Sequence, residues 1–295
     1  MKIVPACEIE KRILRIRGAI ALSILIVFIF CYGTASTCTI FNGNRDDMVL
    51  VGNNEDGAYS TKVKIWFVPA TEKGYGRVCF GWNRCLFFPQ AQGGMNDQGL
   101  FFDWALCPKS HPPTFSFRKR IGTFGLPESL LAQCSTVDEA IQWLRQYTIP
   151  FIRSHIMLVD RSGDSAVVEW VDGEMKILRK KNDYKVITNF WLSHPELGNY
   201  PCGRYDTVRE LMENPPEISI EYFASILKMV SQHEQTEGGK ECGTIYSTIY
   251  DLANGEIYIY YKRDFENPIK LNLERELKKG NHSYTLESFF MNNSR

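Results

Sequence analysis

The sequence lacks an excess of charge of either sign. Lys and Arg together number 34, as do Asp and Glu, and no run of like charge stands out. A basic stripe with interleaved aromatic side chains, the pattern typical of nucleic-acid binding, is also missing. We therefore expect no nucleic-acid partner.

Metal-binding and repeat patterns are missing as well. The chain contains no Cys-x-x-Cys pair and no His-rich spacing of the kind that holds a metal ion. It has no internal repeat, linker or low-complexity stretch, which favours a single domain. We expect neither a metal nor an organic cofactor.

Long hydrophobic runs are scarce. The one strongly apolar segment, Gly18–Phe30, falls short of the roughly 20 residues that a helix needs to span a bilayer. It follows the basic stretch Lys11–Arg17 and precedes the small residues Gly33–Thr37. This layout is typical of a secretory signal peptide, so we expect removal of residues 1–37 and export of the protein. The alternative is an uncleaved N-terminal anchor, the only membrane contact that we expect.

The predicted cleavage changes the number of cysteines in the mature protein. Of nine cysteines, seven follow residue 37, and an odd number in an oxidising compartment leaves at least one thiol unpaired. Cys79 and Cys85 flank a possible turn at Gly81–Asn83 and could form a disulfide, although the sequence cannot set the connectivity.

Strand and helix patterns are segregated along the chain, which favours an α+β fold. The expected strands lie at Cys38–Phe41, Met48–Gly52, Lys62–Val68, Arg77–Trp82, His155–Val159, Ser165–Val171, Val186–Thr188, Thr244–Tyr250 and Glu256–Tyr261. The expected helices lie at Val137–Tyr147, Arg204–Met212 and Ile220–Ser231. We also predict a tight turn at Gly93–Gly99, a closing hairpin across Asn254–Gly255 and one domain over residues 38–295.

Cys38 directly follows the small residues of the predicted cleavage region. If cleavage falls between Thr37 and Cys38, one residue carries a thiol with a pKa of about 8.5 and a free α-amine with a pKa of about 8. Nucleophile and base then share one residue, and no catalytic histidine is needed. Taken alone, a cysteine at the start of a strand is more often structural than catalytic.

Five short motifs share an order and spacing with a known enzyme group. They are Cys38-Thr39-Ile40-Phe41, Gly52-Asn53-Asn54-Glu55-Asp56, Gly94-Met95-Asn96-Asp97-Gln98-Gly99-Leu100, Val186-Ile187-Thr188-Asn189 and Gly203-Arg204-Tyr205. Over essentially all of residues 38–295, the chain resembles the N-terminal-nucleophile hydrolases of the choloylglycine hydrolase and penicillin V acylase group. It is similar too to the related isopenicillin N acyltransferase branch. The resemblance implies a four-layered αββα sandwich.

The resemblance also implies roles for four residues. Cys38 matches the nucleophile, and Asp56 matches an aspartate that holds the α-amine of that nucleophile. Asn189 matches an asparagine that donates to the oxyanion, and Arg204 matches an arginine whose charge lowers the thiol pKa. The implied reaction is cleavage of a linear amide in a small-molecule N-acyl substrate through a thioester, or acyl transfer from the same intermediate.

Two departures from the group's pattern limit the substrate assignment. Asn53 stands where the bile-salt and penicillin enzymes have arginine, and Leu106 stands where they have a second oxyanion asparagine. The aromatic side chains of Phe101, Phe102 and Trp104 could line an acyl pocket or form plain core. Bile-salt specificity therefore does not follow, and the acyl group, the amine and the oligomeric state stay open.

Two rival readings remain. One is a hydrolase of the Cys–His type that pairs an internal cysteine with His111, His155, His194 or His233. The other is a non-enzymatic binding domain, tethered to the membrane by the uncleaved segment, in which Cys38 is an internal residue.

Overall fold

The computed structural model describes residues 38–85, 88–111, 120–121, 125–149, 153–237 and 239–293. The predicted signal segment and the junction ahead of Cys38 lie outside these residues. Among the described residues, no helix is both long and apolar enough to cross a membrane.

The first sheet has seven strands, one of which starts directly after Cys38, the predicted nucleophile. Its order is β12 (Tyr184–Ile187), β1 (Thr39–Arg45), β2 (Met48–Ala58), β14 (Lys240–Asp251), β15 (Glu256–Tyr261) and β16 (Asp264–Asn272), with β13 (Gln235–Glu237) paired to β14. Every pairing is antiparallel. The central strands β1, β2 and β14 come from opposite ends of the described chain.

The second sheet has eight strands, also antiparallel. Its order is β11 (Glu174–Arg179), β10 (Ser165–Val171), β9 (Ser154–Val159), β6 (Phe101–Leu106), β5 (Phe88–Asn96), β4 (Arg77–Cys85), β3 (Lys64–Val68) and β17 (His282–Thr285). A short parallel pair, β7 (Arg120–Ile121) and β8 (Tyr147–Thr148), stands apart from both sheets.

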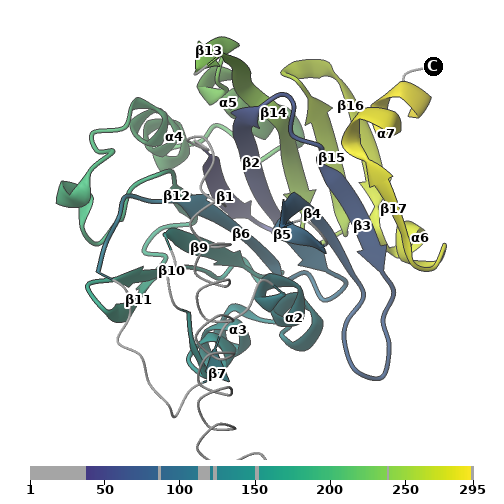
Figure 1. Cartoon of the computed structure of the whole chain (residues 1–295), viewed down its shortest axis with the longest axis horizontal. Coiled ribbons are helices and arrows are strands. Elements are labelled where there is room, and N and C mark those ends of the chain that lie inside the picture. The colour runs from purple at the N-terminus through teal and green to yellow at the C-terminus, as the bar shows by residue number, and fades with distance from the viewer. Residues whose placement is uncertain are drawn as a thin grey trace, which may run out of the picture.

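Helices cover the outer face of each sheet, which produces four layers (Figure 1). On the second sheet these are α2 (Leu126–Gln133) and α3 (Val137–Leu144), and on the first they are α4 (Gly203–Glu213) and α5 (Ile220–Val230). The 3-10 turn η1 (Pro195–Leu197) precedes α4, and α6 (Leu273–Leu277) and α7 (Leu286–Asn293) lie near the C-terminal end.

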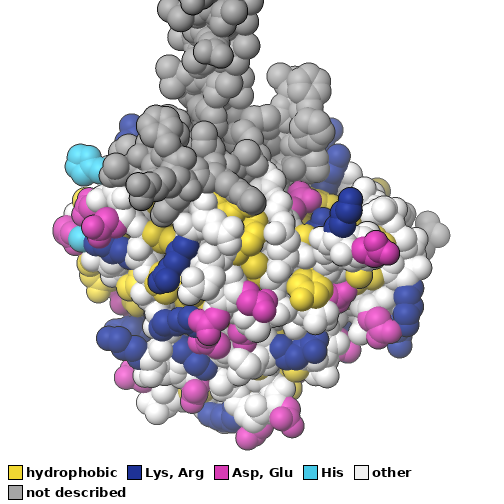
Figure 2. Space-filling model, turned by 90° about the horizontal axis from the view of Figure 1, so that it is seen from below, with side chains coloured by type: hydrophobic (Ala, Val, Ile, Leu, Met, Phe, Trp, Pro, Cys, Tyr) yellow, Lys and Arg dark blue, Asp and Glu magenta, His cyan; other side chains and the backbone are white. Residues whose placement is uncertain are grey.

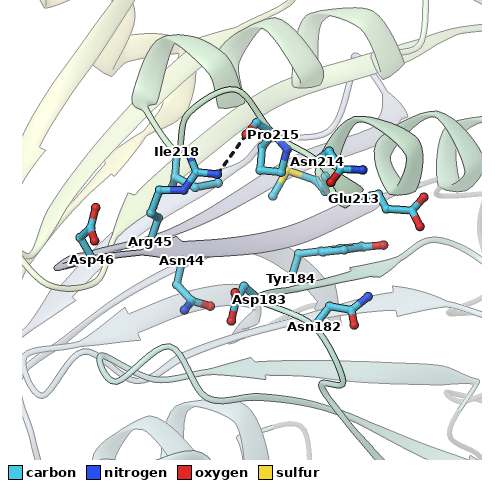
Figure 3. Close-up of a pocket in the computed structure, with 11 residues that line it drawn as sticks. Asn44, Arg45, Asp46, Asn182, Asp183, Tyr184, Glu213, Asn214, Pro215 and Ile218 are labelled. Carbon is cyan, nitrogen blue, oxygen red and sulfur yellow. Dashed lines mark hydrogen bonds between the residues drawn. The ribbon is translucent and has the colours of Figure 1, made fainter.

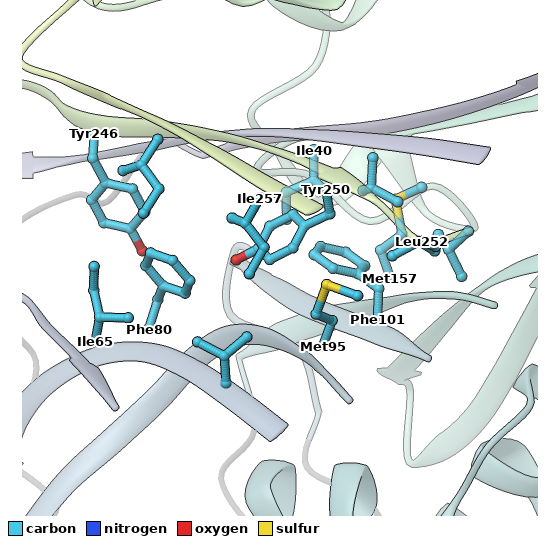
Figure 4. Packing of buried hydrophobic residues seen from close by; sticks show 14 of the residues in the cluster. Ile40, Ile65, Phe80, Met95, Phe101, Met157, Tyr246, Tyr250, Leu252 and Ile257 are labelled. Carbon is cyan, nitrogen blue, oxygen red and sulfur yellow. The ribbon is translucent and has the colours of Figure 1, made fainter. Parts of the chain in front are cut away.

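Three apolar clusters hold these layers together. Between the sheets, Phe80 stacks on Tyr246 with ring centroids 5.8 Å apart, and Phe101 meets Tyr250 at 4.9 Å (Figure 4). A second cluster fills the space under α2 and α3, and a third lies under α4 and α5. Strands such as β9 and β10 are therefore buried on both faces, which explains their largely apolar sequences.

On the surface, positive and negative side chains are interspersed. Figure 2 shows this mixture on the face seen from below, with small apolar patches between the charged groups. It matches the equal numbers of basic and acidic residues in the sequence.

Several sequence-based expectations need correction. The residues Gly81–Asn83 do not form a turn, because they lie inside β4, and Gly93–Asn96 belong to β5. The Asn254–Gly255 hairpin does not close the chain, since β16, α6, β17 and α7 follow it. Cys79 is a free, buried thiol rather than half of a disulfide.

Candidate active site

Cys38 lies immediately before β1 and is almost fully buried, with 2% of its surface exposed. Thr39 pairs with Asn54 across the antiparallel β1–β2 hairpin, so the residue before Thr39 lies beside the residue after Asn54. That residue is Glu55, and the Cys38 thiol donates a hydrogen bond to Glu55 Oε1 at 3.4 Å.

Arg204, in the first turn of α4, connects the predicted site residues. Its Nη1 donates to the Cys38 carbonyl oxygen at 2.8 Å and to Thr39 Oγ1 at 2.6 Å. Its Nη2 donates to Asn189 Oδ1 at 3.0 Å, and Nη1 lies 3.9 Å from Asp56 Oδ2. One guanidinium therefore contacts Cys38, Asp56 and Asn189.

Asp56 is a buried carboxylate near the end of β2, next to β14. It pairs in register with Thr244, whose Oγ1 donates to Asp56 Oδ1 at 2.5 Å. The Thr244 hydroxyl in turn accepts from the Gln232 backbone N–H at 2.7 Å. These contacts fix the direction of the Asp56 carboxylate from the side opposite to Arg204.

Asn189 follows β12 and is held at both ends of its side-chain amide. Its Nδ2 donates to the Leu106 carbonyl oxygen at 3.0 Å, and its Oδ1 accepts from Arg204. The Asn189 carbonyl accepts from Asn199 Nδ2 at 2.8 Å. Leu106 stands where the resemblance expects a second asparagine, and it contributes its backbone carbonyl to the site.

The structure thus brings the four predicted site residues, Cys38, Asp56, Asn189 and Arg204, into one connected cluster. They come from the start of β1, the end of β2, the segment after β12 and the first turn of α4. The cluster contains a thiol, a carboxylate, an amide and a guanidinium. These groups can supply a nucleophile, an anchor for an amine, an oxyanion donor and a fixed positive charge.

Two buried acidic residues were not predicted from the sequence, namely Glu55 beside the thiol and Asp103 close to Glu55. Glu55 and Asp103 are each 1% exposed, and burial followed by the charge of Glu55 raises the pKa of Asp103 well above its ordinary value. Burial, then Glu55 and Asp103, likewise raise the pKa of Tyr246. The alternation of β2 carries a signal for this cluster, because Val51 faces the core between the sheets and Glu55 follows it by an even number of residues.

The aromatic residues of β6 are core rather than pocket lining. Phe101 lies between the two sheets, whereas Phe102 faces α2 and α3, and both are fully buried. Trp104 packs on the same side as Phe102, with ring centroids 6.4 Å apart. Of the two alternatives for Phe101 and Phe102, acyl pocket or plain core, their burial favours plain core.

Among the residues that the structure describes, the histidines form no accessible Cys–His site. His155 lies beside Cys107, but both side chains are at most 1% exposed, and both ring nitrogens of His155 already have hydrogen-bond partners. His111 and His233 are exposed, and His194 contacts Glu196. This geometry argues against an internal cysteine as nucleophile.

A separate pocket lies at the opposite end of β1. It is lined by Arg45 and the segments around Asp183 and Asn214, and Arg45 donates to the carbonyl oxygens of Pro215 and Pro216 (Figure 3). None of the four site residues lines it. Within the described ranges, no group of three or more His, Cys, Asp or Glu side chains is arranged to hold a metal ion.

Sequence comparison identifies the family. The family described as acyl-coenzyme A:6-aminopenicillanic acid acyl-transferase matches residues 42–265, more than half of the chain. The chain belongs to this family. Asp56, Asn189 and Arg204 lie within the matched range, and Cys38 lies just ahead of it. A penicillin V acylase from Pectobacterium atrosepticum is 26% identical over 208 residues, which are 59% of this chain and 55% of the relative. The match thus spans about half the length of that relative.

Solved structures resemble this member of the family in fold. A variant of the conjugated bile acid hydrolase from Clostridium perfringens aligns with a TM-score of 0.69 and 19% identity, over 84% of this chain and 96% of that one. Penicillin V acylase from Agrobacterium tumefaciens aligns with a TM-score of 0.61 and 20% identity, over 81% and 88% of the two chains. The expected αββα sandwich of the N-terminal-nucleophile hydrolases is confirmed.

Proposed function

We propose that this protein is an exported hydrolase that cleaves the linear amide bond of a small-molecule N-acyl substrate. In this proposal, removal of residues 1–37 makes Cys38 the first residue of the mature chain, with a free α-amine. The observation that supports it most directly is the Arg204 guanidinium, which contacts Cys38, Thr39 and Asn189 and lies 3.9 Å from Asp56.

The proposed acylation step uses both functional groups of Cys38. The α-amine accepts the thiol proton, and the thiolate attacks the amide carbonyl carbon. Asn189 Nδ2 donates to the oxyanion that forms, while Asp56 holds the new ammonium group in place. The ammonium then returns its proton to the leaving amine as the carbon–nitrogen bond breaks, which leaves a thioester on Sγ.

In the second step, water attacks the thioester, the acid leaves, and the thiol is restored. Acyl transfer differs only at this point, because an acceptor amine attacks the thioester instead of water. Membership of an acyl-transferase family supports acyl transfer as a second candidate activity. Both activities need the same nucleophile, so one set of variants tests both.

The test compares Cys38→Ala with Cys134→Ala on N-acyl p-nitroanilides of varied acyl length. Cys134 is a matched control, since it is also buried and burial raises its pKa to about 12, which keeps the thiol protonated. We expect Cys38→Ala to abolish p-nitroaniline release and Cys134→Ala to retain it. Intact mass establishes that all three proteins begin at residue 38.

Two outcomes separate the alternatives. Added hydroxylamine traps the acyl group as a hydroxamate if a thioester forms, and an added acceptor amine reports transfer. Unchanged p-nitroaniline release by Cys38→Ala would contradict the proposal. A protein that keeps residues 1–37 and shows no turnover over the whole series would favour the membrane-tethered, non-enzymatic binding domain.

A further inference from the structure

A buried histidine–carboxylate pair lies behind the segment that carries Asn189. His155 on β9 and Glu169 on the adjacent strand β10 are both fully buried, with His155 Nδ1 3.1 Å from Glu169 Oε1. Neither residue belongs to the four-residue site, and the proposed mechanism does not use them. Burial of two ionisable groups is costly unless every polar atom has a partner.

His155 reaches the active-site segment through its second nitrogen. Nε2 lies 2.7 Å from the carbonyl oxygen of Thr188, the residue just before Asn189. A carbonyl oxygen can only accept, so Nε2 carries a proton, while Nδ1 faces a carboxylate. Burial alone would lower the pKa of His155, but Cys107 and Glu169 raise it to about 10, so the ring is an imidazolium that donates from both sides.

Glu169 holds the other end of the same segment. Its Oε1 accepts from the Leu192 backbone N–H at 2.7 Å. Its Oε2 accepts from the Ser193 backbone N–H at 3.1 Å and from the Ser193 hydroxyl at 2.5 Å. Between these anchors, Trp191 packs edge-on against the His155 ring. Residues 188–193 are thus tied to the second sheet on both sides of Asn189.

We propose that the His155–Glu169 pair positions Asn189 for donation to the oxyanion and so controls the rate of the acyl-transfer steps. The inference rests on the proposed function. An oxyanion donor is effective only within about 2.7–3.1 Å of the developing charge, so a small displacement of Asn189 weakens catalysis. Thr188 directly precedes Asn189. The hydrogen bond from His155 to the Thr188 carbonyl oxygen therefore fixes the position of the backbone from which the Asn189 side chain extends.

Two substitutions separate this role from simple core packing. The amide nitrogen of glutamine reaches the place of imidazole Nε2, whereas that of asparagine reaches the place of Nδ1. His155→Gln therefore keeps a donor to the Thr188 carbonyl, and His155→Asn keeps one only toward Glu169. Both variants remove the same charge from the same site.

His282 provides a matched control pair. Its Nε2 lies 3.0 Å from Glu276 Oε2 and its Nδ1 lies 2.8 Å from the Gly280 carbonyl oxygen, so it also bridges a carboxylate and a backbone carbonyl, with the two ring nitrogens exchanged relative to His155. It belongs to β17, the edge strand of the second sheet opposite to β11. His282→Gln and His282→Asn thus report the general effect of breaking such a bridge.

The experiment measures kcat, KM and amide hydrogen exchange over residues 188–193 for the mature protein and the four variants. For His155→Asn we expect kcat to fall by about 10²–10³ with KM within about threefold, because the lost interaction acts in the transition state. His155→Gln should recover most of that loss. Exchange over residues 188–193 should be faster in His155→Asn than in His155→Gln, and the His282 variants should match the unaltered protein.

Three results would overturn the inference. They are unchanged exchange over residues 188–193 in folded His155→Asn, equal kcat for His155→Asn and His155→Gln, or an equal loss in the His282 variants. If the unaltered protein releases no amine, the proposed function fails, and the exchange rates alone decide whether the pair holds the segment.

Discussion

Two groups of opposite charge contact Cys38, one through its thiol and one through its carbonyl. Glu55 accepts from the thiol, and Arg204 donates to the carbonyl oxygen. A nearby positive charge favours the thiolate, whereas a nearby carboxylate disfavours it. The thiolate fraction of Cys38 therefore depends on both neighbours. Glu55 lies inside the second motif, but the resemblance implied no role for it.

Glu55→Gln tests this balance at the residue scale. Removal of the carboxylate should lower the thiol pKa, so the pH profile of Cys38 alkylation by iodoacetamide should move to lower pH by about one unit. Glu213→Gln, at an exposed position at the end of α4, is the charge-matched control and should leave the profile in place. A shift to higher pH, or none, would mean that Glu55 does not set the thiolate fraction.

Among the elements, those with strong local signals were predicted well. The predicted bounds of β10 and β15 agree with the structure, and α5 ends one residue earlier than expected. Thr136 caps α3 by accepting from the Glu139 backbone N–H. Alternation, helical spacing and capping side chains are local properties, so the sequence alone reveals them.

Elements without such signals were missed. The N-cap position of α2 is occupied by Gly125, which offers no side-chain cap, and β16 is a polar strand at the edge of its sheet. Glycines also misled the prediction in β4 and β5. A Cβ on Gly81 would lie 2.0 Å from the Gln90 carbonyl oxygen, and one on Gly94 would lie 2.2 Å from that of Val78. These glycines permit close approach of paired strands, a long-range requirement that resembles a turn in the sequence.

The residues of the candidate site also divide into those with a local sequence signal and those without one. Cys38, Asp56, Asn189 and Arg204 were predicted because each belongs to a motif with the right order and spacing. Asp103 joins Glu55 only through the packing of one sheet on the other, which no local pattern specifies. His155 was weighed as a catalytic base, but its partners on β10 and after β12 are separated from it by many residues in the chain.

The His155–Glu169 pair links β9, β10 and the end of β12, and it predicts how stability depends on pH. The folded-state pKa of His155, about 10, lies above its ordinary value of 6.5. Its contribution is therefore fully present below about pH 6.5 and is lost as the pH rises through 10. Burial raises the pKa of Glu169, but the hydrogen bond and charge of His155 together with the hydrogen bonds from Ser193 and Leu192 lower it below its ordinary value, so its own contribution is lost only in acid.

We expect the difference in free energy of unfolding between the unaltered protein and His155→Gln to shrink from pH 7 to pH 10.5. Urea denaturation at each pH measures it. Cys107 and Lys185 are two other titratable groups that interact with the pair. Cys107→Ser and Lys185→Met in both backgrounds therefore control for their titration. A difference that stays constant or grows toward high pH would contradict the assignment of an imidazolium.

At the scale of the whole molecule, the two sheets place residues from distant parts of the chain at the start of β1. The site combines strands of the first half, the segment after β12 and a helix of the outer layer (Figure 1). The packing between layers fixes this assembly, yet the proposed chemistry depends on the chain end. While residue 37 is still attached, the Cys38 nitrogen is an amide and cannot accept the thiol proton.

The central claim is therefore tested most directly by the N-terminus of the active protein. N-terminal sequencing and intact mass of the fraction that releases amine from N-acyl substrates should show a chain that begins at Cys38. An active fraction in which Thr37 or any earlier residue is still attached would contradict the account, whatever the geometry of Asp56, Asn189 and Arg204.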